Sequence, residues 1–229
     1  MKAMILAAGR GKRLDPLTAS TPKPLVKVAD KPLLQYHIEN LASIGVKEIV
    51  INTSWLGDKI ESYFGNGSSF GVNIEWSREP ELLDTGGGVK KALPLLGNAP
   101  FLLINSDIWS NFSLNNLLKK PLTPGIYAHL ILVPNPSHNK LGDFTLSSKN
   151  KIRLPRIKNP TYTFSGISIL SPEIFNIFKL NEKKFPLTDL LVKAITLDSV
   201  TGSVCDEIWC DVGTIERLSA LNKILAKSR

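Results

Sequence analysis

Short apolar runs alternate with segments of helical period through the first half of the chain. Four runs rich in Ile, Val and Leu predict buried strands at residues 1–7, 47–52, 72–77 and 100–107. Three segments with the spacing of amphipathic helices lie between them, at residues 33–45, 55–65 and 87–97. This alternation predicts an α/β fold with a mostly parallel central sheet flanked by helices, in which ligands bind at the carboxyl ends of the strands.

The second half of the chain is richer in strands. We expect strands at residues 126–133, 143–146, 151–154 and 163–170. Helices are expected near residues 172–178 and 187–196, and a last helix follows residues 208–213. No internal repeat, low-complexity tract or linker divides the chain, so we expect residues 1–229 to form a single domain whose second half elaborates the same sheet.

The formal charge of +8 is compatible with nucleic acid, an acidic membrane surface or small polyanions as partners. Five of the 28 basic residues cluster in one loop-like segment, namely Arg10, Lys12, Arg13, Lys23 and Lys27. Glycine and proline interrupt this cluster, which favours a compact anion site over a helix that reads DNA, although basic surface loops of this kind also occur without a function. We therefore expect no nucleic-acid partner.

No apolar run reaches the roughly 18 to 20 residues needed to cross a bilayer, so we expect no membrane partner and a cytoplasmic location. The two cysteines, Cys205 and Cys210, have no further Cys or His around them at the spacing of a zinc site. We expect them to be reduced, buried thiols.

The loop after the first strand contains Gly9 and Gly11 but neither of two familiar phosphate-binding patterns. Leu6 and Arg13 break the Walker A pattern, and Leu14 stands where the dinucleotide fingerprint needs its third glycine. The ingredients of a phosphate site are nevertheless present, because glycines let backbone N–H groups approach an anion and Arg13 offers a planar, permanently charged donor. On glycine spacing alone, an ordinary turn with solvated charges is an equally good interpretation.

Longer motifs point to a family. The string LAAGRGKRLDPLTASTPKPL, residues 6–25, resembles the N-terminal signature of the sugar-1-phosphate nucleotidyltransferases. Residues 79–93, EPELLDTGGGVKKAL, resemble the family's nucleobase loop, and residues 105–107, NSD, resemble its metal site. Residues 208–214, IWCDVGT, resemble its W-x-D-x-G-T element. The resemblance extends from residue 3 to about residue 221.

The resemblance implies a Rossmann-like enzyme that joins a nucleoside triphosphate to a sugar 1-phosphate and releases pyrophosphate. It implies a nucleotide-binding part in about residues 1–110 and a sugar-binding part in about residues 111–229. The implied catalytic residues, which bind phosphates, are Arg13 and Lys23. The implied nucleotide-binding residues are Ala8, Gly9, Gly11, Arg13, Lys23, Leu83, Thr85, Gly86 and Gly87. The expected sugar contacts are Asn105, Asp143, Ser165 and Gly166, and the implied Mg²⁺ ligands are Asp107 and Asp211.

The reaction suits these residue types. A sugar phosphate is already ionised at neutral pH and needs no general base, so His37, His129 and His138 are expected to be structural or surface residues. The barrier is mainly electrostatic and calls for fixed positive charge and Mg²⁺. Asp107 and Asp211 each follow an apolar strand, and two strands that end side by side would bring the carboxylates to one ion. Three consecutive glycines favour a site where a flat base passes close to the backbone.

Within the family, the short chain, the TGGG loop and residues 55–71 most resemble uridylyltransferases that act on N-acetylmuramate 1-phosphate in cell-wall precursor recycling. Guanylyltransferases that make GDP-mannose are close by motif. A catalytically silent regulatory subunit is a further alternative, although such a subunit is expected to lose an arginine, lysine or aspartate that this chain retains. We expect a monomer or weak dimer.

The chain lacks an acidic residue that many relatives carry in the sugar half, where it has Lys158, Asn159 and Pro160. One hypothesis is that the sugar itself bears a carboxylate, which Arg153, Arg156 and Lys158 would attract. A solvated edge strand is the competing interpretation.

Overall fold

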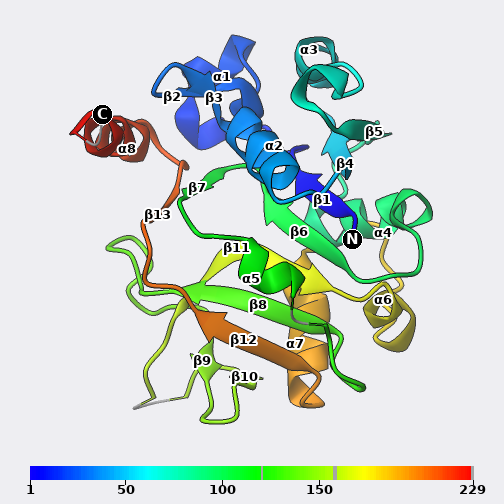
Figure 1. Cartoon of the computed structure of the whole chain (residues 1–229). Coiled ribbons are helices and arrows are strands. Elements are labelled where there is room, and N and C mark those ends of the chain that lie inside the picture. Colours follow the sequence, from blue (N-terminus) through cyan, green and yellow to red (C-terminus); the bar gives the residue numbers. More distant parts are fainter. Residues whose placement is uncertain (120, 157–158, 228–229) are drawn as a thin grey trace.

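The computed structural model describes residues 1–119, 121–156 and 159–227. A seven-stranded sheet has the order β12-β8-β11-β6-β1-β4-β5 and contains strands from both halves of the chain (Figure 1). Its strands are β1 (Ala3–Leu6), β4 (Glu48–Thr53), β5 (Asn73–Arg78), β6 (Phe101–Asn105), β8 (Ala128–Val133), β11 (Thr163–Leu170) and β12 (Val200–Val204).

Most neighbours in this sheet are parallel. β1 pairs in parallel with β4 and β6, β4 with β5, and β12 with β8. β11 runs antiparallel to both β6 and β8 and so joins the two parallel groups. The predicted mostly parallel α/β sheet is therefore confirmed.

Among the described residues, three two-stranded sheets lie outside the central one. They are β2 (Lys27–Val28) with β3 (Lys31–Pro32), β7 (Ile108–Ser110) with β13 (Trp209–Asp211), and β9 (Thr145–Leu146) with β10 (Ile152–Arg153). The β7–β13 pair matters most for the site, because it fixes a late segment of the chain against the end of β6.

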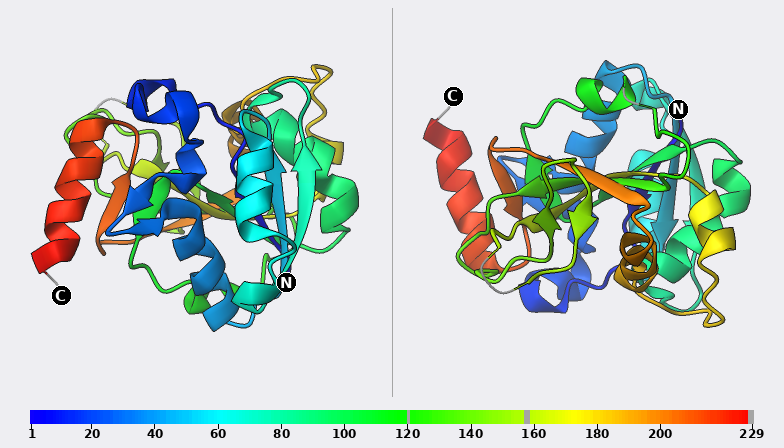
Figure 2. Two further views of the ribbon diagram at one scale, coloured as in Figure 1. Left: turned by 90° about the horizontal axis from the view of Figure 1, so that it is seen from above. Right: turned by 90° about the horizontal axis from the view of Figure 1, so that it is seen from below.

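The helices are α1 (Leu17–Ser20), α2 (Leu33–Ser43), α3 (Gly57–Phe64), α4 (Asp84–Leu96), α5 (Asn115–Leu118), α6 (Glu173–Ile177), α7 (Leu187–Thr196) and α8 (Ile215–Lys227). Single 3₁₀ turns, η1 (Lys12–Leu14), η2 (Lys23–Leu25) and η3 (Ser68–Phe70), also occur. α8 lies at one end of the molecule and α4 near the other (Figure 2). Among the described residues, no helix combines the length and apolar character needed to span a bilayer.

Helices cover both faces of the sheet because successive strand residues point to opposite sides. Ile5 of β1 belongs to the buried cluster that contains Ile38 of α2 and Ile60 of α3. Its neighbour Met4 belongs to the cluster that contains Val89 of α4 and Leu191 of α7. These two clusters hold the sheet rigidly, and the loops at its carboxyl edge are built on that support.

The short elements α1, β2, β3, β7 and α5 are not among the predicted ones, and two further differences concern close packing. Strand β12 is not among the predicted strands, because VTGSV has no apolar run; its Gly202 is required because an added Cβ would lie 2.5 Å from Ile152 and 2.9 Å from the Leu130 carbonyl oxygen. Helix α4 begins at Asp84 rather than at residue 87, so the three glycines lie inside its first turns.

Candidate active site

The loop after β1 forms one wall of a cavity of about 360 Å³ at the carboxyl ends of β1, β4 and β6. Gly11 has a φ of +71°, and an added Cβ would lie 3.0 Å from the Lys23 side chain and 3.2 Å from Thr18, so both backbone shape and space favour glycine. Gly9 has nothing within 4 Å of an added Cβ, which leaves its backbone open to the cavity.

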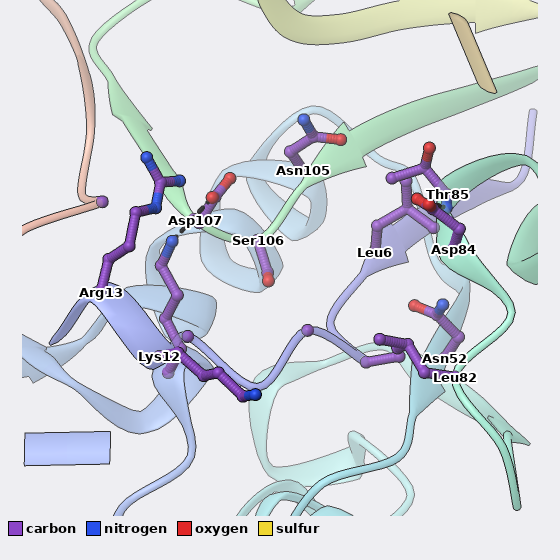
Figure 3. Close-up of a pocket in the computed structure, with 15 residues that line it drawn as sticks. Leu6, Lys12, Arg13, Asn52, Leu82, Asp84, Thr85, Asn105, Ser106 and Asp107 are labelled. Carbon is purple, nitrogen blue, oxygen red and sulfur yellow. Dashed lines mark hydrogen bonds and ion pairs between the residues drawn. The ribbon is translucent and has the colours of Figure 1, made fainter. Parts of the chain in front are cut away.

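This space, called the main cavity below, is lined by Leu6, Ala8, Gly9, Gly11, Lys12, Arg13, Lys23, Asn52, Leu82, Asp84, Thr85, Asn105, Ser106, Asp107 and Gly213. Arg13 and Asp107 lie at one end of it, and Asp84 and Thr85 lie at the other (Figure 3). Positive charge from Lys12, Arg13 and Lys23 is therefore concentrated beside backbone N–H groups of a glycine loop, an arrangement suited to phosphate groups.

Lys23 is held in place by the chain around it. It lies between Pro22 and Pro24 in η2, is only 8% exposed, and its Nζ is 2.7 Å from Oδ2 of Asp107. Arg13, in contrast, is exposed at the cavity. The segment therefore supplies one fixed, buried cation, Lys23, and two solvent-exposed cations, Lys12 and Arg13, that a ligand can reach.

Asp211 is brought next to Asp107 by the β7–β13 pair. Asp211 pairs with Ile108 in this ladder, and the backbone N–H of Val212 donates to the Asp107 carbonyl oxygen at 2.7 Å. The Asp211 carboxylate accepts from Nη1 of Arg217 at 2.7 and 2.8 Å and lies 2.9 Å from Nε2 of His138. His138, expected to be a surface or structural residue, thus contacts a predicted metal ligand.

A second cavity of about 230 Å³ lies on the other side of the end of β6. It is lined by Asn105, Asp107, Ile108, His138, Asn139, Thr163, Phe164, Ser165, Gly166, Trp209 and Asp211. Asn105 and Asp107 line both cavities, so the two spaces meet at the predicted metal site. Gly166 has a φ of +82° at a bulge in β11, and an added Cβ would lie 2.8 Å from the Asn105 amide.

Asp143 is placed differently from the other three expected sugar contacts. Its carboxylate accepts from the backbone N–H of Phe164 at 2.8 Å and from the Asn139 side chain at 3.1 Å, and it lines neither cavity. Asp143 therefore supports the wall of the second cavity from behind, whereas Asn105, Ser165 and Gly166 face the cavity.

Leu83, Gly86 and Gly87 do not line the main cavity. Leu83 and Gly87 face a separate space that Lys183 also lines, and it is Leu82 that faces the main cavity. An added Cβ at Gly86 would overlap the Phe185 ring, and one at Gly87 would overlap the Lys183 carbonyl oxygen. The glycine run is thus explained by close internal packing, and its predicted contact with a base stays a prediction.

The basic residues proposed to meet a sugar carboxylate are not at either cavity. Arg153 pairs with Asp198 at 2.5 Å, and neither Arg153 nor Arg156 lines the main or the second cavity. Lys158 lies outside the described residues. Within the part of the chain that the structure describes, Arg153 and Arg156 are therefore not placed to contact a ligand in these cavities.

Two titratable side chains near the site are held uncharged at neutral pH. Burial lowers the pKa of His37, which lies behind residues 106–108, to about 4. Burial, aided by the charge of Asp211, raises the pKa of the Cys210 thiol to about 11. Cys210 is therefore not a thiolate nucleophile, and Cys205 is a buried free thiol.

The donor set at the junction of the cavities fits Mg²⁺ better than a transition metal. Within residues 1–119, 121–156 and 159–227, no group of three or more His, Cys, Asp or Glu side chains gathers as a metal site. Asp107 and Asp211 offer two carboxylates, and Mg²⁺ is commonly held by one or two carboxylates with substrate phosphate oxygens and water completing its octahedron.

Comparison with known proteins agrees with this geometry. Residues 2–228 match the family model described as nucleotidyl transferase. The chain is 45% identical over 222 residues to N-acetylmuramate alpha-1-phosphate uridylyltransferase of Neisseria meningitidis serogroup B, with 95% of each chain covered. It is 33% identical over 230 residues to mannose-1-phosphate guanyltransferase of Gibberella zeae, covering 93% of this chain and 61% of that relative.

Solved structures show the same fold. HddC from Yersinia pseudotuberculosis, complexed with GMP-PN, superposes with a TM-score of 0.77 at 21% identity, covering 98% of this chain and 99% of HddC. A Bacillus anthracis protein described as a glucose-1-phosphate thymidylyltransferase superposes with a TM-score of 0.87. It is also 21% identical in sequence, and the superposition covers 98% of this chain and 94% of that protein. With the family match and the close relative, the chain belongs to the nucleotidyl transferase family, among its sugar-1-phosphate nucleotidyltransferases.

Proposed function

We propose that this protein transfers the uridylyl group of UTP to N-acetylmuramate 1-phosphate, giving UDP-N-acetylmuramate and pyrophosphate. The observation that carries the proposal is the pair of cavities that meet at Asn105 and Asp107. The 45% identity over nearly the whole length to a uridylyltransferase of that specificity supports the choice of substrates.

In this proposal the triphosphate occupies the main cavity and the sugar 1-phosphate occupies the second. A phosphate oxygen of the sugar 1-phosphate attacks the α-phosphorus, and the bond from that phosphorus to the bridging oxygen of pyrophosphate breaks. Gly9, Gly11, Arg13 and Lys23 bind the phosphates and stabilise the charge that builds up on the leaving pyrophosphate. The nucleophile is already an anion, so no side chain has to remove a proton.

Asp107 and Asp211 would hold Mg²⁺, which supplies positive charge to phosphate oxygens during transfer. Lys23 contacts the Asp107 carboxylate, and Arg217 and His138 contact that of Asp211, so these side chains restrain the two proposed ligands. The free thiols of Cys205 and Cys210 agree with a cytoplasmic, reducing location, which we also propose.

The test is a matrix of five nucleoside triphosphates against several sugar 1-phosphates, scored by pyrophosphate release with Mg²⁺ and with EDTA. We expect the highest kcat/KM for UTP with N-acetylmuramate 1-phosphate and no turnover in EDTA. Faster turnover of GTP with mannose 1-phosphate would instead support a guanylyltransferase, an alternative favoured by the 33% identical relative. No turnover with any pair would indicate a catalytically silent relative.

A further inference from the structure

A chain of buried hydrogen bonds joins the two opposite walls of the main cavity. Asn52, near the end of β4, is 2% exposed and lines the cavity. Its Oδ1 accepts from the backbone N–H of Ala7 at 2.7 Å, and its Nδ2 donates to Oε1 of Glu79 at 2.7 Å. Glu79, which follows β5, is 4% exposed, and its Oε2 accepts from the backbone N–H of Leu83 at 3.0 Å.

The two backbone groups at the ends of this hydrogen-bond chain, the N–H groups of Ala7 and Leu83, lie where the two opposite walls of the main cavity begin. Ala7 is where the backbone leaves β1 to become the glycine loop, and Leu83 directly precedes Asp84 and Thr85, which line the far end of the cavity (Figure 3). The bond from Leu83 to Glu79 holds this part of the backbone so that Leu82 faces the cavity. The side chains of Asn52 and Glu79 thus fix the separation of the two walls.

Helix α4 packs directly on the pair. An added Cβ at Gly88 would lie 2.6 Å from Oε1 of Glu79 and 2.8 Å from Nδ2 of Asn52, so only glycine fits there. The third glycine of the run is therefore required by this polar pair.

A buried carboxylate is a costly way to fill space, because its oxygens lose water and must be satisfied by hydrogen bonds. Glu79 meets that requirement by accepting from Asn52 and Leu83. We propose that Asn52 and Glu79 are positioning residues that hold the glycine loop and residues 82–85 at the spacing that a nucleoside triphosphate needs. The inference rests on the proposed function, because it takes the main cavity to be the nucleotide site.

Three variants change which member of the Asn52–Glu79 pair donates the hydrogen bond and which accepts it. In Glu79→Gln, the new amide oxygen can accept from the Leu83 N–H, but its NH₂ group then faces the NH₂ group of Asn52, so two donors oppose each other. In Asn52→Asp, two carboxylates face each other. In the double variant Asn52→Asp/Glu79→Gln, the donor and the acceptor change places: the new carboxylate at position 52 accepts from the new amide at position 79. Both backbone N–H groups keep an acceptor, and the pair keeps one negative charge.

The readouts are UTP affinity by calorimetry without sugar, the separate KM values for UTP and for the sugar 1-phosphate, and thermal unfolding. We expect each single variant to weaken UTP binding and raise its KM by about tenfold, the scale of one lost buried hydrogen bond. The KM for the sugar 1-phosphate should stay within about twofold, and the double variant should return UTP affinity to within about threefold of the unmodified protein.

Glu61→Gln is the matched control. Glu61 accepts from Thr53 at 3.0 Å and from Arg78 at the same ends of β4 and β5, but it lines neither cavity. It should lose stability without losing UTP affinity.

Single variants with unchanged UTP affinity, or a double variant no better than the worse single, would overturn the inference while leaving the proposed function intact. If a single variant does not fold, the double variant decides alone, since it must fold and bind UTP. Absence of UTP binding by the unmodified protein would overturn the proposed function itself.

Discussion

Acid should destabilise this protein through His37. Its side chain lies on α2 and is 8% exposed, and this burial lowers its pKa from 6.5 to about 4. Hydrogen bonds to the backbone of Ile108 and Ser106 and the charge of Asp107 raise the pKa by smaller amounts. The folded-state pKa lies below the unfolded value, so between pH 6.5 and 4 the unfolded chain binds the proton and the folded chain does not. The contribution of His37 to the free energy of unfolding is complete above about pH 7 and is lost as the pH falls toward the folded-state pKa of about 4.

Linkage gives the size of the loss. With pKa values of 6.5 unfolded and about 4 folded, His37 removes about 2 kcal/mol of unfolding free energy by pH 5 and about 3 kcal/mol by pH 4. A typical domain has roughly 5 to 15 kcal/mol in total, so the effect is large enough to measure.

The assay is urea unfolding of the unmodified protein and of His37→Asn at pH 7.5, 6 and 5 in EDTA. Asparagine keeps a donor near Nδ1 and removes the titration. Acidic side chains titrate alike in both proteins, so the stability difference between them isolates His37; it should shrink by about 2 kcal/mol from pH 7.5 to pH 5. An unchanged difference, or an imidazole NMR titration of His37 with its midpoint near 6.5, would refute the reasoning.

Four further substitutions probe the site and its support. Arg13→Ala should fold normally but lose about 10²-fold or more in turnover, the scale of a removed transition-state charge donor; near-normal turnover in a pyrophosphate-release assay would reject that role. Asp107→Asn should abolish Mg²⁺-dependent turnover, and an unaltered Mg²⁺ titration would show that the ion binds elsewhere. Gly86→Ala should cost about 1–3 kcal/mol in urea unfolding, because its Cβ would overlap the buried Phe185 ring, whereas Gly9→Ala, with nothing within 4 Å, should leave stability within about 0.5 kcal/mol. Equal stability of the two alanine variants would contradict the packing explanation.

The sequence was most informative where a buried strand ends in a polar residue. An apolar run followed by Asn or Asp indicated the cavity edge at residues 105–107, and the same logic for Asp211 anticipated that two distant segments meet. Local glycine and proline spacing was enough to suggest the loop that carries Arg13 and Lys23, although the motif was needed to choose between a turn and a phosphate site.

Contacts set by tertiary packing were not accessible in this way. Which of Leu82 and Leu83 faces the cavity depends on one hydrogen bond from Leu83 to Glu79, and nothing local to the loop reveals it. The Phe185 ring and the Lys183 carbonyl pack against the glycine run, but both come from a segment far along the chain. The sequence around the glycines does not reveal this packing, so a base site was the interpretation that it favoured. His138 lies in an irregular connection, and its approach to Asp211 has no periodic signal.

The two cavities share Asn105 and Asp107, and the rest of their linings come from different segments. Asn105 and Asp107 lie at the end of β6, the strand between the halves, so a change there disturbs both ligands at once. The remaining lining of the second cavity comes from Ile108, residues 138–139, β11 and β13, which the main cavity does not use. Under the proposed function, new sugars can be accommodated by remodelling Asn139 and β11, whereas Asp211 of β13 and its contact His138 have to stay because they belong to the proposed Mg²⁺ site.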